Sequence, residues 1–329
     1  MSHSAEQSAG ERILVTGSTG FVGGALLSGL MEAGRFDVVA QYRDQPGAIS
    51  PLIDAVRVPS INGETDWKAA LERVDVVVHC AARVHVMNET TSDPLAAFRR
   101  VNVEGTLALA RQAASAGVRR FIYLSSIKVN GEETNKGPFN AQDKCSPTDP
   151  YGISKWEAEQ GLLALAAENA MDVVIVRPPL IYGPGVKANF LRMIKWMDRG
   201  IPLPLATVHN SRSLVGLTNL VAFLIHCIEH PDAGNQIFLV SDGQDLSTPA
   251  LLSKVAGALG KTPRLLPFPV SLLTGLAALV GKKAELSRLC GSLTIDIEKN
   301  RRLLGWQPQS SVSDELKRTV KAYRQQESK

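Results

Sequence analysis

The chain has 329 residues, of which 44% are hydrophobic and 21% charged, a balance that excludes a largely disordered protein. The formal net charge is only +4 and no run of Lys and Arg exceeds two residues, so we expect no binding to nucleic acid. The four cysteines lie far apart without ligand spacing, which gives no support for disulfides or a metal site and makes a cytoplasmic location the expectation.

In chain order, the polar residues 1–10 come first, and we expect them to be a disordered lead-in. Apolar runs of strand length then alternate with amphipathic runs of helix length. The predicted strands are residues 12–16, 36–42, 55–58, 75–79, 120–124 and 172–176. The predicted helices are residues 21–33, 65–73, 94–116 and 150–170. This alternation predicts an α/β fold, a Rossmann-type doubly wound parallel sheet.

After residue 176 the pattern changes. Residues 177–213 are rich in Pro and Gly, an apolar run and a helix follow at 214–229, and a strand is predicted at 236–240. The remainder is mostly helical. We therefore expect a dinucleotide-binding domain and a smaller, mostly helical substrate-binding lobe. The domain would consist of residues 11–179 plus 212–244, and the lobe of residues 180–211 plus 245–329.

The most apolar stretch of the chain is Leu265–Val280. It is shorter than the roughly 20 apolar residues that a membrane span needs, and it contains two prolines and a glycine. We expect no integral membrane segment and predict a buried or half-buried helix, with peripheral membrane contact as the alternative.

A glycine-rich loop follows the first predicted strand. Gly17, Gly20 and Gly23 have the spacing G-x-x-G-x-x-G and lead into the predicted helix 21–33. Such glycines allow a tight turn, close approach of a diphosphate and close helix packing, and the helix N-terminus offers amides to phosphate. We predict that a dinucleotide contacts the loop, including its residues Thr19, Phe21 and Val22.

The end of the second predicted strand bears on the choice of cofactor. NAD sites place an acidic residue there for the ribose hydroxyl, whereas NADP sites favour Arg. In this chain Gln41 stands in place of the acid and Arg43 follows closely. We therefore favour NADP(H), with NAD(H) as the alternative because Asp44 lies beside Arg43.

A candidate catalytic set follows the fifth predicted strand. Tyr151 and Lys155 form Y-x-x-x-K near the start of a predicted helix, one turn apart on one face. A nearby ammonium lowers the pKa of a phenol and makes it a usable acid or base near neutrality. Ser125 and Ser126 end the strand, at the sheet edge where ligands bind in such folds.

At this point the chain resembles an extended short-chain dehydrogenase/reductase of the NAD-dependent epimerase/dehydratase group, whose members act on nucleotide sugars. The motifs that carry the resemblance are TGSTGFVG, VVVHCAARV, VNVEGT, YLSSIKVNGE, PYGISK, RPPLIYGPG, RSLVGLTNL and RRLLGWQP. They extend over roughly residues 11 to 310.

The resemblance implies a role for each matching residue. Tyr151 is the acid/base, Lys155 tunes it and binds the nicotinamide ribose, and Ser126 hydrogen-bonds the reacting oxygen. Asn102 supports the lysine through a water. Further cofactor contacts fall on Ala81, Ala82, Arg177 and Pro178. Substrate contacts fall on Arg83, His85, Ser125, Asn189, Arg212 and Arg288.

The resemblance also bears on the reaction. Ser126 is followed by Ile127 and Lys128, not by the Asp-Glu pair of the 4,6-dehydratases, so we do not expect dehydratase chemistry. The chain most resembles a bacterial subgroup that serves O-antigen and capsule synthesis. We expect NAD(P)H-dependent reduction of the C4 keto group of a UDP-4-keto-6-deoxy-N-acetylhexosamine, giving UDP-N-acetylquinovosamine or UDP-N-acetylfucosamine.

Three alternatives stay open from the sequence. The first is a UDP-hexose 4-epimerase with tightly bound NAD, and the second is a reductase or hydroxysteroid-type dehydrogenase with a non-sugar substrate. The third is a non-catalytic NAD(P)-binding regulator. The resemblance also favours a homodimer formed through residues 94–116 and 150–170.

Overall fold

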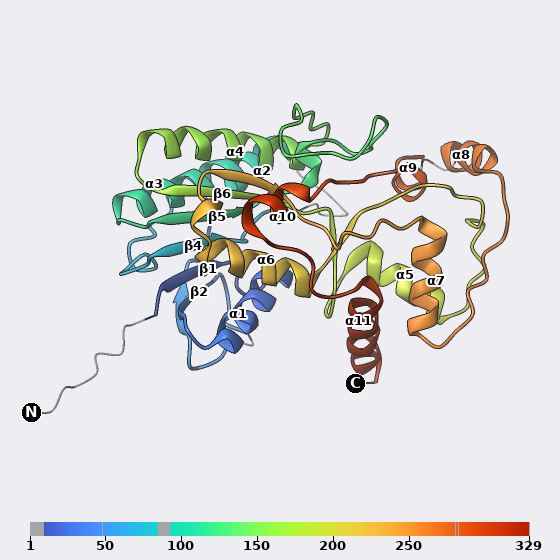
Figure 1. Ribbon diagram of the computed structural model, residues 1–329, viewed down its shortest axis with the longest axis horizontal. Helices are drawn as coiled ribbons and strands as arrows, with labels where there is room; N and C mark the ends of the chain where they lie inside the picture. The colour runs from blue at the N-terminus through green and yellow to red at the C-terminus, as the bar shows by residue number, and fades with distance from the viewer. Residues whose placement is uncertain (1–9, 48, 85–92, 280, 282, 329) are drawn as a thin grey trace, which may run out of the picture. The chain divides into compact units, whose positions relative to one another are not determined.

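The computed structural model of the chain describes residues 10–47, 49–84, 93–279, 281 and 283–328 (Figure 1). Of the predicted lead-in, only Gly10 lies within this part of the chain. The described residues form two compact units. The first unit is drawn from Met1–Ser125, Asp149–Val176 and Leu224–Ile237, and the second from Ser126–Thr148, Arg177–Phe223 and Phe238–Lys329.

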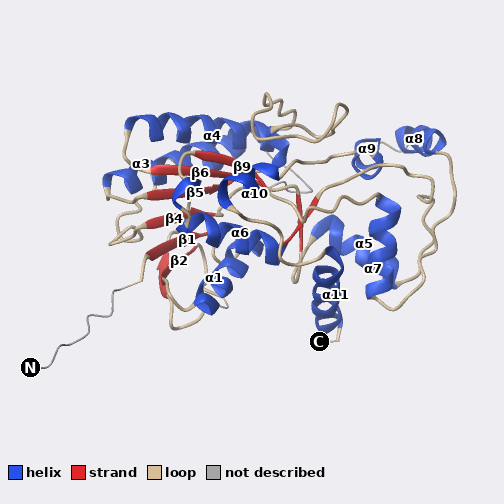
Figure 2. Cartoon of the chain, viewed as in Figure 1, coloured by secondary structure: helices blue, strands red, loops and turns tan. Residues whose placement is uncertain are grey.

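A seven-stranded sheet has the strand order β3-β2-β1-β4-β5-β6-β9 (Figure 2). The strands are β1 Arg12–Thr16, β2 Asp37–Tyr42, β3 Asp54–Arg57, β4 Val76–His79, β5 Arg120–Leu124, β6 Asp172–Arg177 and β9 Gln236–Leu239. All pairings from β3 through β6 are parallel. The order reverses between β1 and β4, and ligands of open α/β sheets bind beyond the carboxyl ends of the strands at such a point. The predicted Rossmann-type α/β fold is confirmed.

Helices of the first unit cover the sheet. Their bounds are α1 Phe21–Ala33, α2 Pro94–Arg99, α3 Thr106–Ser115 and α4 Pro150–Glu168. Leu109 of α3 and Leu162 of α4 belong to the same buried cluster as Phe121 of β5 and Val173 of β6. Helices α3 and α4 therefore pack on one face of the sheet and fix the position of the α4 residues relative to the strand ends.

The helix predicted at 94–116 forms as three successive segments. A π-helical stretch, η1 (Arg100–Gly105), separates α2 from α3.

The prediction of a helix at 65–73 is wrong, since only turns form there. The backbone N–H of Trp67 donates to the side chain of Gln112 at 2.8 Å, and Arg73 takes a positive φ of 56° that stops the helical course. Tertiary contacts thus override the local helical pattern.

The second unit is mostly helical, and the predicted helical C-terminal region is confirmed. Its strands β7 (Leu180–Tyr182) and β8 (Leu214–Gly216) pair in parallel. Its helices are α5 Ala188–Asp198, α7 Thr248–Ala258, α8 Val270–Leu279, α9 Lys283–Cys290, α10 Glu298–Leu304 and α11 Val312–Glu327, while α6 (Leu217–Glu229) begins in this unit and ends in the first. Two short 3₁₀ segments, η2 (Ile127–Val129) and η3 (Pro231–Ala233), also form. No helix in the described ranges has both the length and the hydropathy to cross a bilayer.

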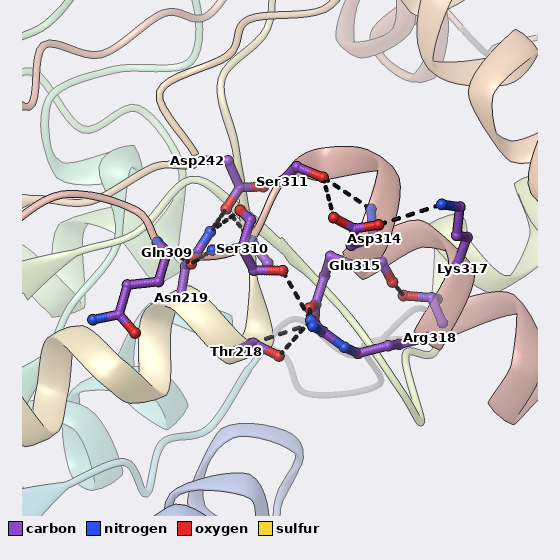
Figure 3. A network of polar contacts seen from close by, with 12 residues as sticks. Thr218, Asn219, Asp242, Gln309, Ser310, Ser311, Asp314, Glu315, Lys317 and Arg318 are labelled. Atoms are coloured by element: carbon purple, nitrogen blue, oxygen red, sulfur yellow. Dashed lines mark hydrogen bonds and ion pairs between the residues drawn. The ribbon is translucent and has the colours of Figure 1, made fainter.

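A buried polar network holds the second unit together around Asp242 (Figure 3). One carboxylate oxygen of Asp242 accepts hydrogen bonds from the amide of Asn219 at 2.7 Å and from the backbone N–H of Gly216 at 2.8 Å. The other oxygen accepts from the Tyr182 hydroxyl at 2.8 Å. Asn219 continues the network to the carbonyl of Ser310 at 2.9 Å, just before α11. The network therefore ties β7, β8 and α6 to the C-terminal helix.

Candidate active site

The glycine loop lies between β1 and α1 and has the shape of a cradle. Gly17 takes a positive φ of 67°, and a Cβ there would lie 2.8 Å from the backbone of Ala81. A Cβ on Gly23 would lie 2.2 Å from the Gly17 carbonyl oxygen. Side chains are thus excluded from both positions. Helix α1 then begins with no acidic residue and no capping side chain among the described residues in its first turn, so its amides can receive a diphosphate.

Gln41, at the end of β2, supports this loop from within the protein. Its side chain is buried, and its amide oxygen accepts a hydrogen bond from the backbone N–H of Gly17 at 2.9 Å. Its amide nitrogen donates to the carbonyl of Val58 at 3.2 Å. The polar residue that replaces the usual acid is therefore part of the scaffold of the loop.

Arg43 points to solvent instead. Its side chain is 73% exposed and pairs with the neighbouring Asp44 at 2.9 Å. An exposed ion pair of this kind contributes little energy and does not hold the guanidinium in one place. The geometry therefore offers no prearranged site for a 2′-phosphate, and the expected preference for NADP(H) is not supported.

Tyr151 and Lys155 lie in the first two turns of α4. The Asp149 carboxylate caps the helix by accepting from the Gly152 N–H at 2.6 Å, and Pro150 occupies the first turn. This start places Tyr151 and Lys155 one turn apart on one face. The half-buried Tyr151 ring makes an edge contact with Phe98 of α2, with 6.0 Å between ring centroids.

Lys155 is a buried cation. It is 2% exposed, its ammonium donates to the carbonyl of Leu124 at 2.8 Å, and it lies 4.4 Å from the ring centroid of Tyr123. Burial lowers the pKa of Lys155 to about 8, and the nearby Glu159 carboxylate opposes this shift by raising the pKa. The ammonium is therefore held close to the strand end from which Ser125 and Ser126 follow.

Glu159 is a site residue that the sequence analysis missed. It is fully buried one turn beyond Lys155, and its carboxylate accepts a short hydrogen bond from the Ser125 hydroxyl. The spacing of Tyr151, Lys155 and Glu159, four residues each, was the available signal, because residues at i and i+4 share a helix face. Ser125, predicted as a substrate contact, turns its hydroxyl toward Glu159 inside the protein.

Asn102 joins the segment after β4 to α4. It lies in η1, is buried, and accepts a hydrogen bond from the Arg83 N–H at 2.8 Å. Its amide also donates to the Ser154 hydroxyl at 3.0 Å, beside Lys155. Ala81 and Ala82 lie on the same segment, and the Ala81 N–H donates to the Thr16 hydroxyl at 3.3 Å, just before the glycine loop. The structure thus brings these predicted cofactor residues together within the first unit.

Arg83 and His85 were predicted as substrate contacts. The Arg83 guanidinium lies 5.6 Å from the ring centroid of Phe98, which also contacts Tyr151. His85 lies outside the described residues.

Other predicted residues belong to the second unit. Ser126 is the N-cap of η2 and accepts from the Lys128 N–H at 3.3 Å. Arg177 is buried and donates to the side chain of Asn130 at 3.0 Å, while the carbonyl of Pro178 accepts from the Ile127 N–H at 2.9 Å. Ser126, Arg177 and Pro178 therefore lie around the same turn.

The predicted diphosphate contacts are more dispersed. Arg212 donates to the carbonyl of Gly291 at 2.9 Å, immediately after α9, and burial lowers its pKa. Arg288 lies on α9 itself, exposed, 4.0 Å from Glu132. Asn189 lies on α5 and accepts from Arg192 at 2.9 Å. Arg212 and Arg288 thus flank one end of α9, and Asn189 lies on a different helix.

A family model described as the NAD dependent epimerase/dehydratase family matches residues 13–241, which is most of the chain. The chain belongs to this family. The match includes the glycine loop, Tyr151 and Lys155, so the family resemblance carried by the sequence motifs is confirmed.

Individual relatives are similar over nearly the whole chain. A UDP-glucose 4-epimerase of Vibrio cholerae is 45% identical over 315 residues, 95% of each chain. An N-acetyl-alpha-D-glucosaminyl-diphospho-ditrans,octacis-undecaprenol 4-epimerase of Escherichia coli O157:H7 is 28% identical over 307 residues, 88% of each chain. The solved structure of UDP-glucuronic acid 4-epimerase from Bacillus cereus in complex with NAD has a TM-score of 0.77 and 21% identity, with 96% of this chain and 99% of that chain covered. These relatives are 4-epimerases, and they do not confirm the predicted 4-reductase subgroup.

Proposed function

We propose that the protein interconverts the two configurations at C4 of a UDP-hexose, with NAD as its cofactor. The observation that carries the proposal is the pair on α4, in which the half-buried phenol of Tyr151 lies one turn from the buried ammonium of Lys155. The pair follows a parallel sheet whose first strand leads into the glycine loop. The 45% identity to a UDP-glucose 4-epimerase adds support. The 4-reductase expected from the sequence becomes the competing hypothesis.

The residues of the first unit fit a dinucleotide. Gly17 and Gly23 leave room for its diphosphate, and the N-terminus of α1 offers amides to the negative charge. We propose NAD over NADP, because Arg43 is paired on the surface and related structures such as the Bacillus cereus epimerase contain NAD. When bound, the nicotinamide supplies a hydride acceptor and donor for C4.

The protein's own part is the movement of one proton. Tyr151 takes the proton of the 4-hydroxyl group when C4 is oxidised and returns a proton to the same oxygen when C4 is reduced. The Lys155 ammonium stabilises the phenolate, and Glu159 keeps Lys155 protonated within a buried site. We propose that Ser126 donates a hydrogen bond to the reacting oxygen.

The substrate contacts remain predictions from the sequence. We propose that Arg212, Arg288 and Asn189 bind the UDP end, and that Arg83 and His85 contact the sugar. Residues 180–211 plus 245–329 keep their proposed role in substrate binding. Binding energy from the distant UDP group would position C4 against the hydride donor.

The test is product analysis with purified protein and NAD. We expect UDP-glucose to be converted to an equilibrium mixture with UDP-galactose, with no net change in nicotinamide absorbance. Net loss of NADPH or NADH with a UDP-4-keto-6-deoxy-N-acetylhexosamine, without interconversion of the hydroxyl sugars, would establish the 4-reductase and overturn the proposal. Cofactor binding with neither reaction would favour the non-catalytic regulator.

A further inference from the structure

Helix α8 exposes a row of leucines. Leu272, Leu276 and Leu279 have 56%, 55% and 84% of their surface exposed, and Leu266 in the preceding loop has 52%. At 100° per residue the three helix positions fall within a sector of about 60° on one side of α8. We call Leu272, Leu276 and Leu279 the α8 patch.

The opposite side of α8 faces the protein. Val270 and Leu273 pack against the buried cluster of the second unit that includes Leu252 and Val255 of α7. Helix α8 contains no charged residue, and its outer side presents leucines as its inner side does. Contiguous exposed apolar surface marks an interaction site.

The charge of the chain segment that contains the patch indicates the kind of partner. In the sequence, residues 246–284 contain five Lys or Arg (Lys254, Lys261, Arg264, Lys282 and Lys283) and no Asp or Glu, and of these Lys261 pairs with Asp198 at 2.6 Å. The whole chain has a net charge of +4, so the remaining residues together carry −1. The positive excess of the protein is therefore concentrated in the segment that presents the apolar patch.

This combination fits a lipid surface. A bilayer with anionic headgroups offers an apolar interior for leucines and negative charge for the flanking lysines and arginines. A second copy of the chain packed symmetrically on α8 would instead bring two positively charged segments together, which Coulomb repulsion disfavours.

We propose that the protein docks reversibly on anionic membranes through the α8 patch, with α8 lying in the plane of the interface. Leu272, Leu276 and Leu279 enter the headgroup boundary, while the inner side of α8 keeps its packing on α7. The proposal is independent of the reaction catalysed.

The test is sedimentation with lipid vesicles, which requires no substrate. We expect the full-length protein to bind vesicles containing about 30% phosphatidylglycerol at least about tenfold more strongly than pure phosphatidylcholine vesicles, and to be released by high salt. The double variant Leu276→Glu/Leu279→Glu is expected to lose this binding by about tenfold or more.

A matched control separates the patch from exposed leucines in general. Leu52, in the first unit, is 83% exposed, and Leu52→Glu is expected to bind vesicles like the wild type. Unchanged thermal unfolding and NAD binding show that each variant is folded. Equal vesicle binding by the α8 variant, or no preference for anionic lipid, would overturn the proposal. A dimer that the α8 variant converts to a monomer, without vesicle binding, would assign the patch to a second copy and overturn it equally.

Discussion

Two buried polar clusters, one in each unit, differ in how completely their charges are satisfied. In the second unit, Asp242 accepts a hydrogen bond from Asn219 (Figure 3). Within the described part of the chain it also accepts from Gly216 and Tyr182. In the first unit, the Lys155 ammonium donates to the carbonyl of Leu124 and otherwise faces an aromatic ring and a carboxylate that already binds Ser125.

The difference matches two roles: the Asp242 cluster is structural, and we propose that the Lys155 cluster serves the reaction. Burial raises the pKa of Asp242, and hydrogen bonds from three separate segments oppose the rise and fix the carboxylate in place. Burial lowers the pKa of Lys155 to about 8, close to the range in which an enzyme exchanges protons. Replacing a residue of the Lys155 site should therefore reduce activity with little loss of stability. Replacing Asp242 should reduce stability with little loss of activity.

The largest expected effect is that of Tyr151→Phe. This change removes the proton carrier and keeps the ring that contacts Phe98, so we expect kcat to fall about 10³-fold with little change in thermal stability. Epimerase assays and thermal unfolding measure the two quantities. Tyr323→Phe, which removes a hydroxyl bonded to Asp198 at 3.1 Å, is the control and should keep its activity. Full activity of Tyr151→Phe would contradict the proposed role.

Asp242→Ala should act on stability instead. It removes the acceptor of the buried Tyr182 hydroxyl and one of the two acceptors of the Asn219 amide, so we expect the free energy of unfolding to fall by about 3 kcal/mol. Denaturant titration gives this value. The folded fraction of the variant should keep a kcat within about twofold of the wild type, because no atom of this network takes part in the proposed chemistry. A large loss of kcat in folded protein would remove the distinction between the clusters.

Glu159→Gln should change the pH profile. The carboxylate of Glu159 raises the pKa of Lys155, so its loss should lower that pKa below about 8. In the proposed mechanism, activity needs the protonated ammonium and is lost as pH rises through the Lys155 pKa. We therefore expect the alkaline limb of kcat to move to lower pH by about one unit, with about a fivefold loss of kcat at pH 8.

Glu157→Gln is the matched control for that shift. Glu157 lies on the same helix but pairs with Arg99 nearer the surface. Its replacement should leave the pH profile unchanged. If both variants shift the alkaline limb equally, the effect comes from the general charge of α4 and not from Glu159.

The smallest expected effect is that of Arg43→Ala. Because Arg43 is 73% exposed and paired with Asp44, we expect less than about a twofold change in the ratio of NAD to NADP affinity, as measured by fluorescence titration. A marked loss of NADP affinity alone would restore the preference inferred from the sequence.

Much of the first unit could be predicted from the sequence. Strands β1 and β5 and helix α1 have the predicted bounds, because apolar strands covered on both faces and a glycine loop before a helix are strong local signals. Strand β7 and helix α5 were missed, since they lie in a segment rich in Pro and Gly whose helical and strand segments depend on tertiary packing.

The sequence identified residues of the candidate site but not the directions in which their side chains point. The motifs located Tyr151 and Lys155, yet the sequence does not show which of Ser125 and Ser126 turns inward, because both follow the same strand end. Likewise, the exposure of Arg43 depends on where β2 ends and on its pairing with Asp44. Glu159 is recognisable only once the helix face that contains Lys155 is known to be buried.

The π-helical stretch η1 has an evolutionary consequence. Such a stretch contains one residue more than an α-helix that connects the same two ends, and the directions of its side chains are shifted by that insertion. Deleting a single residue before Asn102 would restore an ordinary helix and rotate that amide by about 100°, away from both Arg83 and Ser154. Homologues that tolerate a one-residue deletion here should therefore have replaced the Asn102 bridge with a different link between β4 and α4.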